Sequence, residues 1–493
     1  MAGLVRSSPW RRRQFLGLAF GSLGSLALLA ACGGSAAPTA ANTTASSVAS
    51  ASSAPATSAS SSAANSATSA APAPTSTPVA QGSAQAKGVT ITLSYRGGNE
   101  PYFAERAKAF SAANPDIAID KRPFAGSNTD YYPKLTTALA SGTADDVFWV
   151  STGFGNYQLY AWNKQLIGVD DLLKANKVDM SQWFKAAIDT LTLDGKLYAL
   201  PWGMHPDEIG LYYNKELLQK NGVEPPGVNS ETYDSLATKS VKLTSRAGDT
   251  TSVWGIYTAV GAYSTGLISY VRSFGGDFMT PDKKQPAIDS PQAMAALQWL
   301  SDLRVKQRSN PRASDKLATN NSMEDTFVSG NIAMFNGGVW EMALLDKIKG
   351  HFTMEMSLIP KGPTGIRGSM AHVDTISGYA QGKHQDEAFK LIEFLTNTES
   401  GVQNALVNSF FGARPEVWAD PRPKQKYGPM VDTWSLGTQA SMALDEPYNF
   451  RLVELNDAMD KALGPLWNGD TTPSGVAPTV IAAMNAVLSK PRG

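Results

Sequence analysis

The chain has 493 residues, with 43 lysine plus arginine, 43 aspartate plus glutamate and a formal net charge of zero. This length is more than one core of ordinary size accommodates, so two packed lobes are expected once segments that do not fold are set aside. The charge balance argues against nucleic acid or an acidic lipid surface as the main partner.

The first 32 residues have the layout of an export signal. Three consecutive arginines, starting at Arg11, precede an uncharged apolar run over residues 15–31, and small residues crowd the end of that run. The order RRQFL resembles the twin-arginine export signal, and LAAC, which ends at Cys32, resembles a bacterial lipobox, in which the cysteine becomes the lipidated first residue. The general secretory route stays open as the alternative for export.

Cys32 is the only cysteine in the chain. An intramolecular disulfide, a Cys-rich zinc site and a CxxC redox pair are therefore excluded. A lone cysteine is often a buried small hydrophobe, but its place directly after the apolar run favours acylation. Because two or more acyl chains anchor a protein stably where one does not, we expect an extracytoplasmic protein held on the cell membrane by lipid.

Residues 33–87 consist almost wholly of Ala, Ser, Thr, Pro, Gly and Gln, with no aromatic residue. Such a segment cannot bury enough apolar surface to offset its ordering entropy. The composition predicts a disordered tether that lifts a folded part, beginning at residue 88, off the membrane.

From residue 89 the pattern changes to alternating strands and helices. The first elements expected are a strand at 89–93, a helix at 101–113, a strand at 117–124, a helix at 132–140 and a buried strand at 147–150. This alternation predicts an α/β fold with a parallel sheet and right-handed crossovers. Later helices are expected at 291–305, 385–396, 400–408 and 475–488.

The stretch FVSGNIAMFNGGVW, residues 327–340, predicts a strand that ends in a turn before a helix. Ile332 to Phe335 is a short apolar run, Asn-Gly-Gly turns the chain, and a helix is expected to begin near Val339. Trp340 then lies where the carboxyl end of a strand meets the start of a helix, which is where open α/β sheets place ligands. The alternative is that Trp340 is a core residue.

Several runs together resemble one family. ANPDIAIDKRPF, YPKLTTALASGTADDVFWV, DGKLYALPWG, LYYNKELLQKNGVEPP, LIPKGPTG and EAFKLIEFLTNTES, in this order and with the stretch ending at Trp340, are similar to the extracellular solute-binding proteins of bacterial ABC importers. They fit its carbohydrate-binding group, which includes the maltose-binding protein.

The resemblance implies an α/β, two-lobe periplasmic-binding-protein (type II) fold with a hinge and an interlobe cleft. It implies lobe 1 at 88–204 plus 372–425 and lobe 2 at 205–371 plus 426–493. The expected protein is a monomer that encloses its ligand between the lobes, and an ABC permease would recognise the closed form.

Sugars present flat C–H faces edged by hydroxyl groups, so a sugar site needs aromatic platforms and a few polar groups. By the resemblance, Trp149 matches a sugar-contacting tryptophan and Trp340 matches a stacking tryptophan. Trp202 lies where the chain passes from the first lobe to the second, and it is either a hinge wedge or part of the cleft lining. For each of the three the alternative is a place in the core.

The polar candidates follow strand ends. Arg96 and Asn99 follow the first strand, and a guanidinium can hold two adjacent hydroxyl groups. Asp374, with His372, lies where the chain is expected to return across the hinge. Tyr448 falls in the lobe 2 region where the family places another aromatic residue.

The predicted function is an extracytoplasmic binding lipoprotein that captures a sugar or short oligosaccharide and delivers it to an ABC permease. The chain has four histidines and lacks the HExxH, GxSxG and GxxxxGK[ST] motifs, so no catalytic residue, cofactor or metal ligand is predicted. No EF-hand spacing is present, and a Ca²⁺ site built from scattered oxygens stays open as an alternative. The alternatives are the same fold binding a polyol or glycerol phosphate, a secreted polysaccharide-active hydrolase with two carboxylates facing the cleft, and a receptor that works without a permease.

Overall fold

The computed structural model describes residues 88–126, 128–154, 156–262, 266–317, 322–438 and 451–491. All of them belong to one compact unit, Gly82–Gly493. The export signal with Cys32, the tether and Tyr448 lie outside the described residues.

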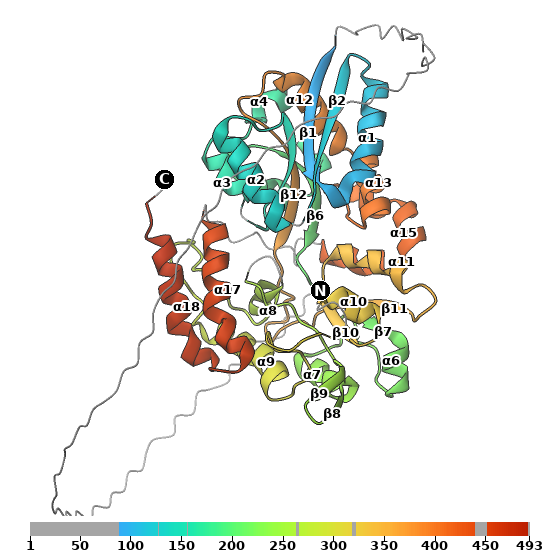
Figure 1. Ribbon diagram of the computed structural model, residues 1–493, viewed down its shortest axis with the longest axis vertical. Coiled ribbons are helices and arrows are strands. Elements are labelled where there is room, and N and C mark those ends of the chain that lie inside the picture. Colours follow the sequence, from blue (N-terminus) through green and yellow to red (C-terminus); the bar gives the residue numbers. More distant parts are fainter. Residues whose placement is uncertain are drawn as a thin grey trace, which may run out of the picture. The chain divides into compact units, whose positions relative to one another are not determined.

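The first sheet combines strands from distant parts of the chain (Figure 1). Its order is β2-β1-β3-β12-β6. β1 (Val89–Arg96), β2 (Ile117–Phe124) and β3 (Val147–Ser151) are parallel, whereas β12 (Ala371–Gly378) is antiparallel to both β3 and β6 (Leu200–Pro206). The inner strands β3 and β12 are buried along their whole length, as strands covered on both faces must be.

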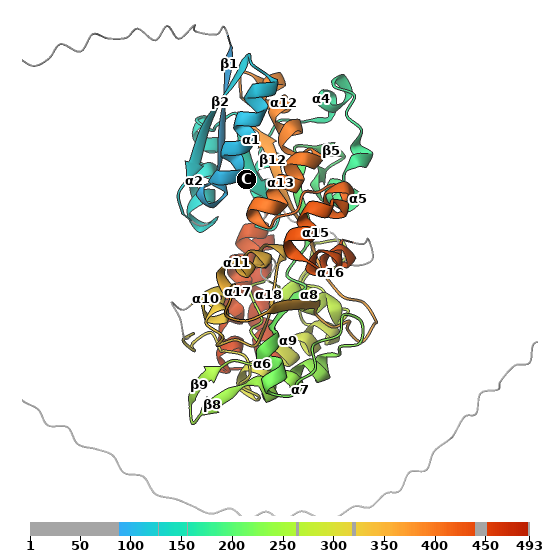
Figure 2. The same ribbon diagram turned by 90° about the vertical axis from the view of Figure 1, so that its right-hand side faces the viewer.

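Helices cover this first sheet on both faces. α1 (Glu100–Ala113) and α12 (Gln385–Leu395) contact each other on one side, and α2 (Asn128–Ser141) lies on the other side of β1 and β2 in both ribbon views (Figures 1 and 2). α12 buries Ala388, Phe389, Leu391, Ile392 and Leu395, a spacing that places them on one helical face.

The second sheet is smaller and antiparallel. Its order is β10-β7-β11, formed by β10 (Met334–Gly337), β7 (Gly210–Asn214) and β11 (Met354–Leu358). Its core includes the side chains of α9 (Pro291–Val305) and of a C-terminal helix pair.

That helix pair is α17 (Leu452–Asn468) and α18 (Pro473–Leu488), which pack against each other and against α9 (Figure 1). α9 and α18 each start with proline at the first helical position, and the preceding Ser290 and Thr472 accept a backbone N–H with their side chains. These signals are readable in the sequence.

The remaining elements are short. They are η1 (Gly97–Asn99), α3 (Asn156–Trp162), α4 (Asp170–Ala175), η2 (Met180–Gln182), α5 (Lys185–Leu191), β4 (Thr192–Leu193), β5 (Lys196–Leu197), α6 (Lys215–Lys220), α7 (Tyr233–Leu243), β8 (Ser245–Ala247), β9 (Thr250–Val253), α8 (Leu267–Ser273), α10 (Met323–Val328), η3 (Val339–Ala343), α11 (Leu344–Ile348), α13 (Thr398–Asn408), α14 (Pro415–Ala419), α15 (Pro421–Tyr427) and α16 (Met430–Gly437).

The chain crosses between the two sheets at adjacent places. β6 leads into β7 and β11 leads back into β12, and β6 and β12 are hydrogen-bonded neighbours with His205 opposite His372. Phe410 packs against the cores of both sheets. These paired strands and Phe410 form the hinge region between two lobes, whose residue limits stay a prediction.

The strands and helices expected in the first lobe are confirmed with small shifts at their ends, and so is the parallel pairing of the first three strands. The strand before Trp340 was predicted at residues 332–335 and lies two residues later, at Met334–Gly337. The Asn336 N–H donates to the carbonyl of Tyr257, and Gly337 pairs with Gly210, so the predicted turn residues continue the strand. The helix expected near Val339 begins there as a 3-10 helix.

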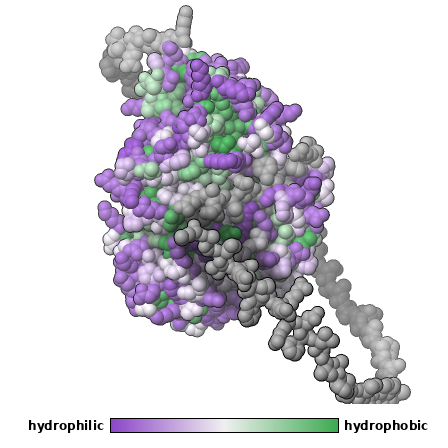
Figure 3. All heavy atoms as spheres, turned by 180° about the vertical axis from the view of Figure 1, so that it is seen from behind, coloured by the Kyte–Doolittle hydropathy of each residue, from purple (hydrophilic) through white to green (hydrophobic). Residues whose placement is uncertain are grey.

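Few large hydrophobic side chains are exposed among the residues that the structure describes. The large hydrophobic residues that are exposed come from four separate segments (Val241, Val305, Ile366 and Val407), and hydrophobic side chains on the face in Figure 3 are interspersed with hydrophilic ones. None of the helices in the described ranges combines the length and apolar character needed to span a bilayer.

Candidate functional site

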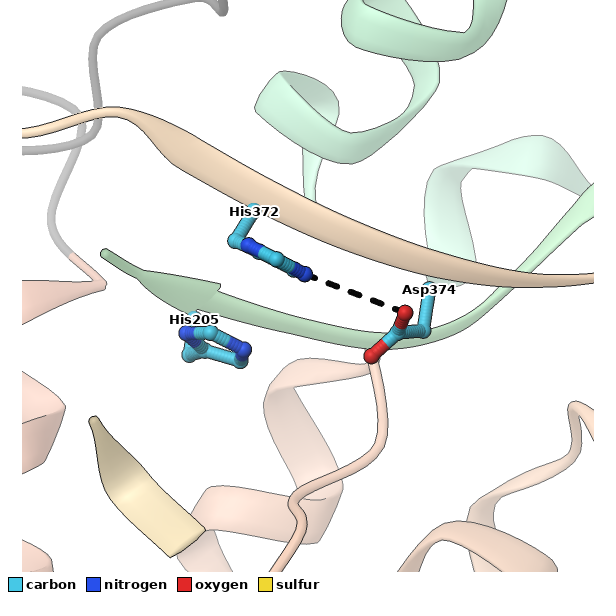
Figure 4. Close-up of side chains that lie close together, drawn as sticks. All are labelled: His205, His372 and Asp374. Carbon is cyan, nitrogen blue, oxygen red and sulfur yellow. Dashed lines mark ion pairs between the residues drawn. The ribbon is translucent and has the colours of Figure 1, made fainter. Parts of the chain in front are cut away.

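Polar side chains gather where the first sheet meets the hinge. Arg96 ends β1, Ser151 ends β3, and His372 and Asp374 lie on β12. Asp374 is opposite Ser151 in one strand pair, and His372 is opposite His205 of β6 in the other. Residues two apart on a strand point to the same face, so β12 presents His372 and Asp374 together (Figure 4).

His372 is the centre of this group. Its ring stacks on His205 with centroids 4.7 Å apart, and its Nε2 lies 2.8 Å from Ser151 Oγ and 3.8 Å from Asp374 Oδ1. Its Nδ1 lies 3.7 Å from Asp207 Oδ1. We name these side chains, Ser151, His205, Asp207, His372 and Asp374, the hinge cluster.

Gly153 makes room for the hinge cluster. A Cβ at this position would overlap the His372 ring, so only glycine allows the backbone after β3 to approach so closely. Glycine is therefore required in the Ser-Thr-Gly segment at the end of β3 because His372, more than two hundred residues later in the chain, packs against it.

The hinge cluster is buried and incompletely hydrogen-bonded. His205 and Asp207 are 0% exposed and Asp374 is 3% exposed. Among the described residues, His205 Nε2, both carboxylate oxygens of Asp207 and Asp374 Oδ1 have no hydrogen-bond partner. Buried polar atoms are normally hydrogen-bonded, so these atoms are candidates for contacts with a bound molecule.

Burial controls the ionisation of these groups. It lowers the pKa of His205 well below its ordinary value, and nearby His372 adds to this effect. Burial raises the pKa of Asp374, which His372 partly opposes. His205 is therefore a neutral imidazole at physiological pH.

Trp149 and Arg96 lie next to the hinge cluster on the lobe 1 side. The Arg96 guanidinium lies 4.8 Å from the centroid of the Trp149 ring, and Tyr132 stacks on the same indole with centroids 5.7 Å apart. The Tyr132 hydroxyl accepts the Ser151 N–H. The Trp149 Nε1 is buried without a hydrogen-bond partner among the described residues, so the ring is 2% exposed yet keeps an unused donor.

Trp340 approaches the hinge cluster from the lobe 2 side. Its ring meets His205 edge to face with centroids 5.2 Å apart, and its Nε1 donates to Glu341 Oε1 over 2.8 Å. Burial raises the pKa of Glu341 to about 8, with a contribution from Glu324. Burial and the neighbouring carboxylates of Asp207 and Glu341 also raise the pKa of Glu208 well above its ordinary value.

Trp202 and Asn99 lie in different surroundings. Trp202 stacks between Phe103 and Phe410 with centroids 5.6 and 5.3 Å away, and its Nε1 donates to the Tyr102 hydroxyl. At 2% exposed it fits the hinge wedge, and a ligand contact by Trp202 stays a prediction. Asn99 is a buried residue just before α1, on the segment that follows Arg96.

The structure thus brings Arg96, Trp149, Trp340 and Asp374 to one place. The sequence analysis missed His205, Asp207, Ser151 and Tyr132. The available signal was the strand-like run over residues 200–206, which carries His205 and is followed directly by the polar residues Asp207 and Glu208. Its pairing with residues 371–374 depends on the return of a distant strand.

Two α/β lobes joined by paired crossing strands, with buried polar groups at the crossing, define a two-lobe periplasmic binding protein of type II with an interlobe cleft. The chain belongs to the bacterial extracellular solute-binding protein family, whose model matches residues 97–402. The resemblance read from the sequence is thereby confirmed, and the family implies a place outside the cytoplasm.

The chain is similar to a binding protein of Brucella abortus, with 22% identity over 83% of this chain and 95% of that protein. It is also similar to the diacetylchitobiose-binding protein of Streptomyces coelicolor, with 26% identity over 57% of this chain and 63% of that protein. The structure of an ABC substrate-binding protein of Listeria monocytogenes in complex with cycloalternan shares the fold, with a TM-score of 0.71 and 22% identity over 81% of this chain and 98% of that one.

Proposed function

We propose that this protein captures a sugar or short oligosaccharide in the interlobe cleft and delivers it to an ABC permease without covalent chemistry. The observation that carries the proposal is the hinge cluster with its buried acceptors, between the indole of Trp149 and the indole of Trp340. A sugar offers hydroxyl donors for Asp207 and Asp374, a hydroxyl acceptor for the Trp149 Nε1 and a C–H face for the Trp340 indole.

In this proposal Trp340 is the platform, Trp149 contacts the sugar through its unused Nε1 donor, and Asp374 accepts hydroxyl groups. Arg96, Asn99 and Tyr448 add polar or aromatic contacts from the surrounding loops. The sugar names carried by relatives, diacetylchitobiose in one and cycloalternan in another, support this ligand class.

Attachment and delivery follow from the amino-terminal sequence. Acylated Cys32 anchors the chain in the membrane, and the tether at 33–87 keeps the monomeric binding part near the permease at high effective concentration. Binding between lobe 1 (88–204 plus 372–425) and lobe 2 (205–371 plus 426–493) favours a closed hinge by as much as the ligand's contacts differ between the open and closed states.

Thermal unfolding of the chain carrying Cys32→Ala, against mono- and oligosaccharides, polyols and glycerol phosphates, tests the proposal. A ligand that binds only the folded state stabilises it by about 2.7 kcal/mol at a hundredfold excess over Kd. We expect a stabilising series among the sugars, and we expect Asp374→Asn to reduce the shift. Stabilisation by polyols or glycerol phosphates alone would contradict the sugar assignment, and consumption of the sugar would contradict pure binding.

A further inference from the structure

His205 has a fixed tautomer. Its Nδ1 lies 3.1 Å from the carbonyl oxygen of Pro206, which can only accept a hydrogen bond. Nδ1 therefore carries the proton, and Nε2 presents a bare lone pair in a buried place where no described residue bonds to it. A ring N–H bound to a backbone carbonyl is how proteins usually orient a metal-ligating histidine.

The other inward atoms of the hinge cluster are also lone-pair donors. One donor atom each from His205, His372 and Asp374 lies within 4.8 Å of the others, and the Asp207 carboxylate adds two oxygens that accept no hydrogen bond from a described residue. Ser151 Oγ contacts the His372 ring at Nε2, and the Pro206 carbonyl contacts the His205 ring at Nδ1. Three of these residues lie on the paired strands β6 and β12, which hold their backbones rigidly (Figure 4).

We propose that His205, His372, Asp374 and Asp207 form a binding site for a divalent transition-metal ion of the zinc class. Two imidazoles with carboxylates suit Zn²⁺, Co²⁺ or Ni²⁺, whereas Ca²⁺ and Mg²⁺ prefer oxygen ligands alone. The sequence has no metal motif, because these ligands come from two segments that only the β6–β12 pairing brings together. The inference goes beyond sugar binding and does not depend on it.

Metal capture requires side-chain rotation. Two ligands about 2.0–2.1 Å from a tetrahedral zinc ion lie roughly 3.4 Å apart, which is closer than the 4.8 Å limit of the present cluster. The planes of the stacked rings also lie within 17° of parallel, so their lone pairs lie in two nearly parallel planes and do not converge on one point between the rings. Turning the His372 ring about its side-chain bonds, while the Pro206 carbonyl keeps His205 in place, changes both the separation and the angle. A bound ion would therefore unstack the two rings and cross-link the hinge strands.

Cobalt titration of the full chain carrying Cys32→Ala, which removes the one thiol, tests this proposal. We expect uptake of one ion per chain, a visible absorption band typical of mixed nitrogen and oxygen ligands, and displacement by Zn²⁺. His205→Gln and Asp374→Asn are each expected to weaken binding by about tenfold or more. The matched control removes the exposed histidines, His351→Ala with His384→Ala, and leaves binding unchanged.

Two results would overturn the metal site. One is absence of stoichiometric uptake by the parent chain, a measurement that does not depend on whether a variant folds. The other is uptake that persists in folded His205→Gln but disappears in the control. Repeating the sugar panel with a chelator distinguishes the two proposals. Sugar binding in the presence of the chelator tests the proposed function without metal. Cobalt uptake in the absence of sugar tests the metal site without the proposed function.

Discussion

Glu341 links the site to pH in a way that can be measured on stability alone. Glu341 is 5% exposed, and its carboxylate accepts the Trp340 N–H. Burial raises its pKa from 4.5 to about 8 in the folded protein. Between these values the folded state keeps a proton that the unfolded state releases.

This difference in pKa determines whether stability rises or falls with pH. The stabilising contribution is fully present below pH 4.5 and is lost as the pH rises through about 8. Each unit of pKa shift corresponds to about 1.4 kcal/mol, so the loss is on the order of 4 kcal/mol across this window. Glu341→Gln is neutral at every pH and still offers an oxygen to Trp340. We expect the variant to gain stability relative to the parent as the pH rises.

Denaturant unfolding of both chains from about pH 5 to about pH 8.5 measures this difference. Glu454→Gln is the control, because Lys490 and Arg451 lower the pKa of Glu454 and its contribution changes only at more acidic pH. A stability difference between Glu341→Gln and the parent that does not change over this range would refute the reasoning, as would the same slope in the Glu454→Gln control.

Three further substitutions separate the roles of individual residues. Trp340→Ala is expected to weaken sugar binding by about 2 kcal/mol or more, as for a buried aromatic anchor, with little change in thermal stability; intact affinity with a large stability loss would assign Trp340 to the core. Trp202→Ala is expected to destabilise the fold by roughly 3–5 kcal/mol because it empties the stack between Phe103 and Phe410, and unchanged unfolding would contradict the hinge-wedge role. Cys32→Ala is expected to release the protein from membranes in cell fractionation, and persistence in the membrane fraction would rule out lipid as the main attachment.

Local patterns in the sequence determined most of the secondary structure. The alternation at 89–93, the apolar run at 147–150 and the proline-led helix at 291–305 are properties of neighbouring residues, and the structure confirms them. The family resemblance was equally readable. Arg96 ends β1, Trp149 lies near the end of β3 and Trp340 follows β10, so their places at the carboxyl ends of strands were predictable.

Only the tertiary structure decided which residues form the hinge cluster. His205 and Asp207 become neighbours of His372 because β12 returns antiparallel to β6, in a register set by hydrogen bonds between segments more than 160 residues apart. Trp202 was undecided for the same reason, since Phe410, which completes its stack, follows α13 and lies more than two hundred residues later in the chain. Sequence periodicity specifies which face of a strand is buried, whereas the partners on that face depend on how the strands pair.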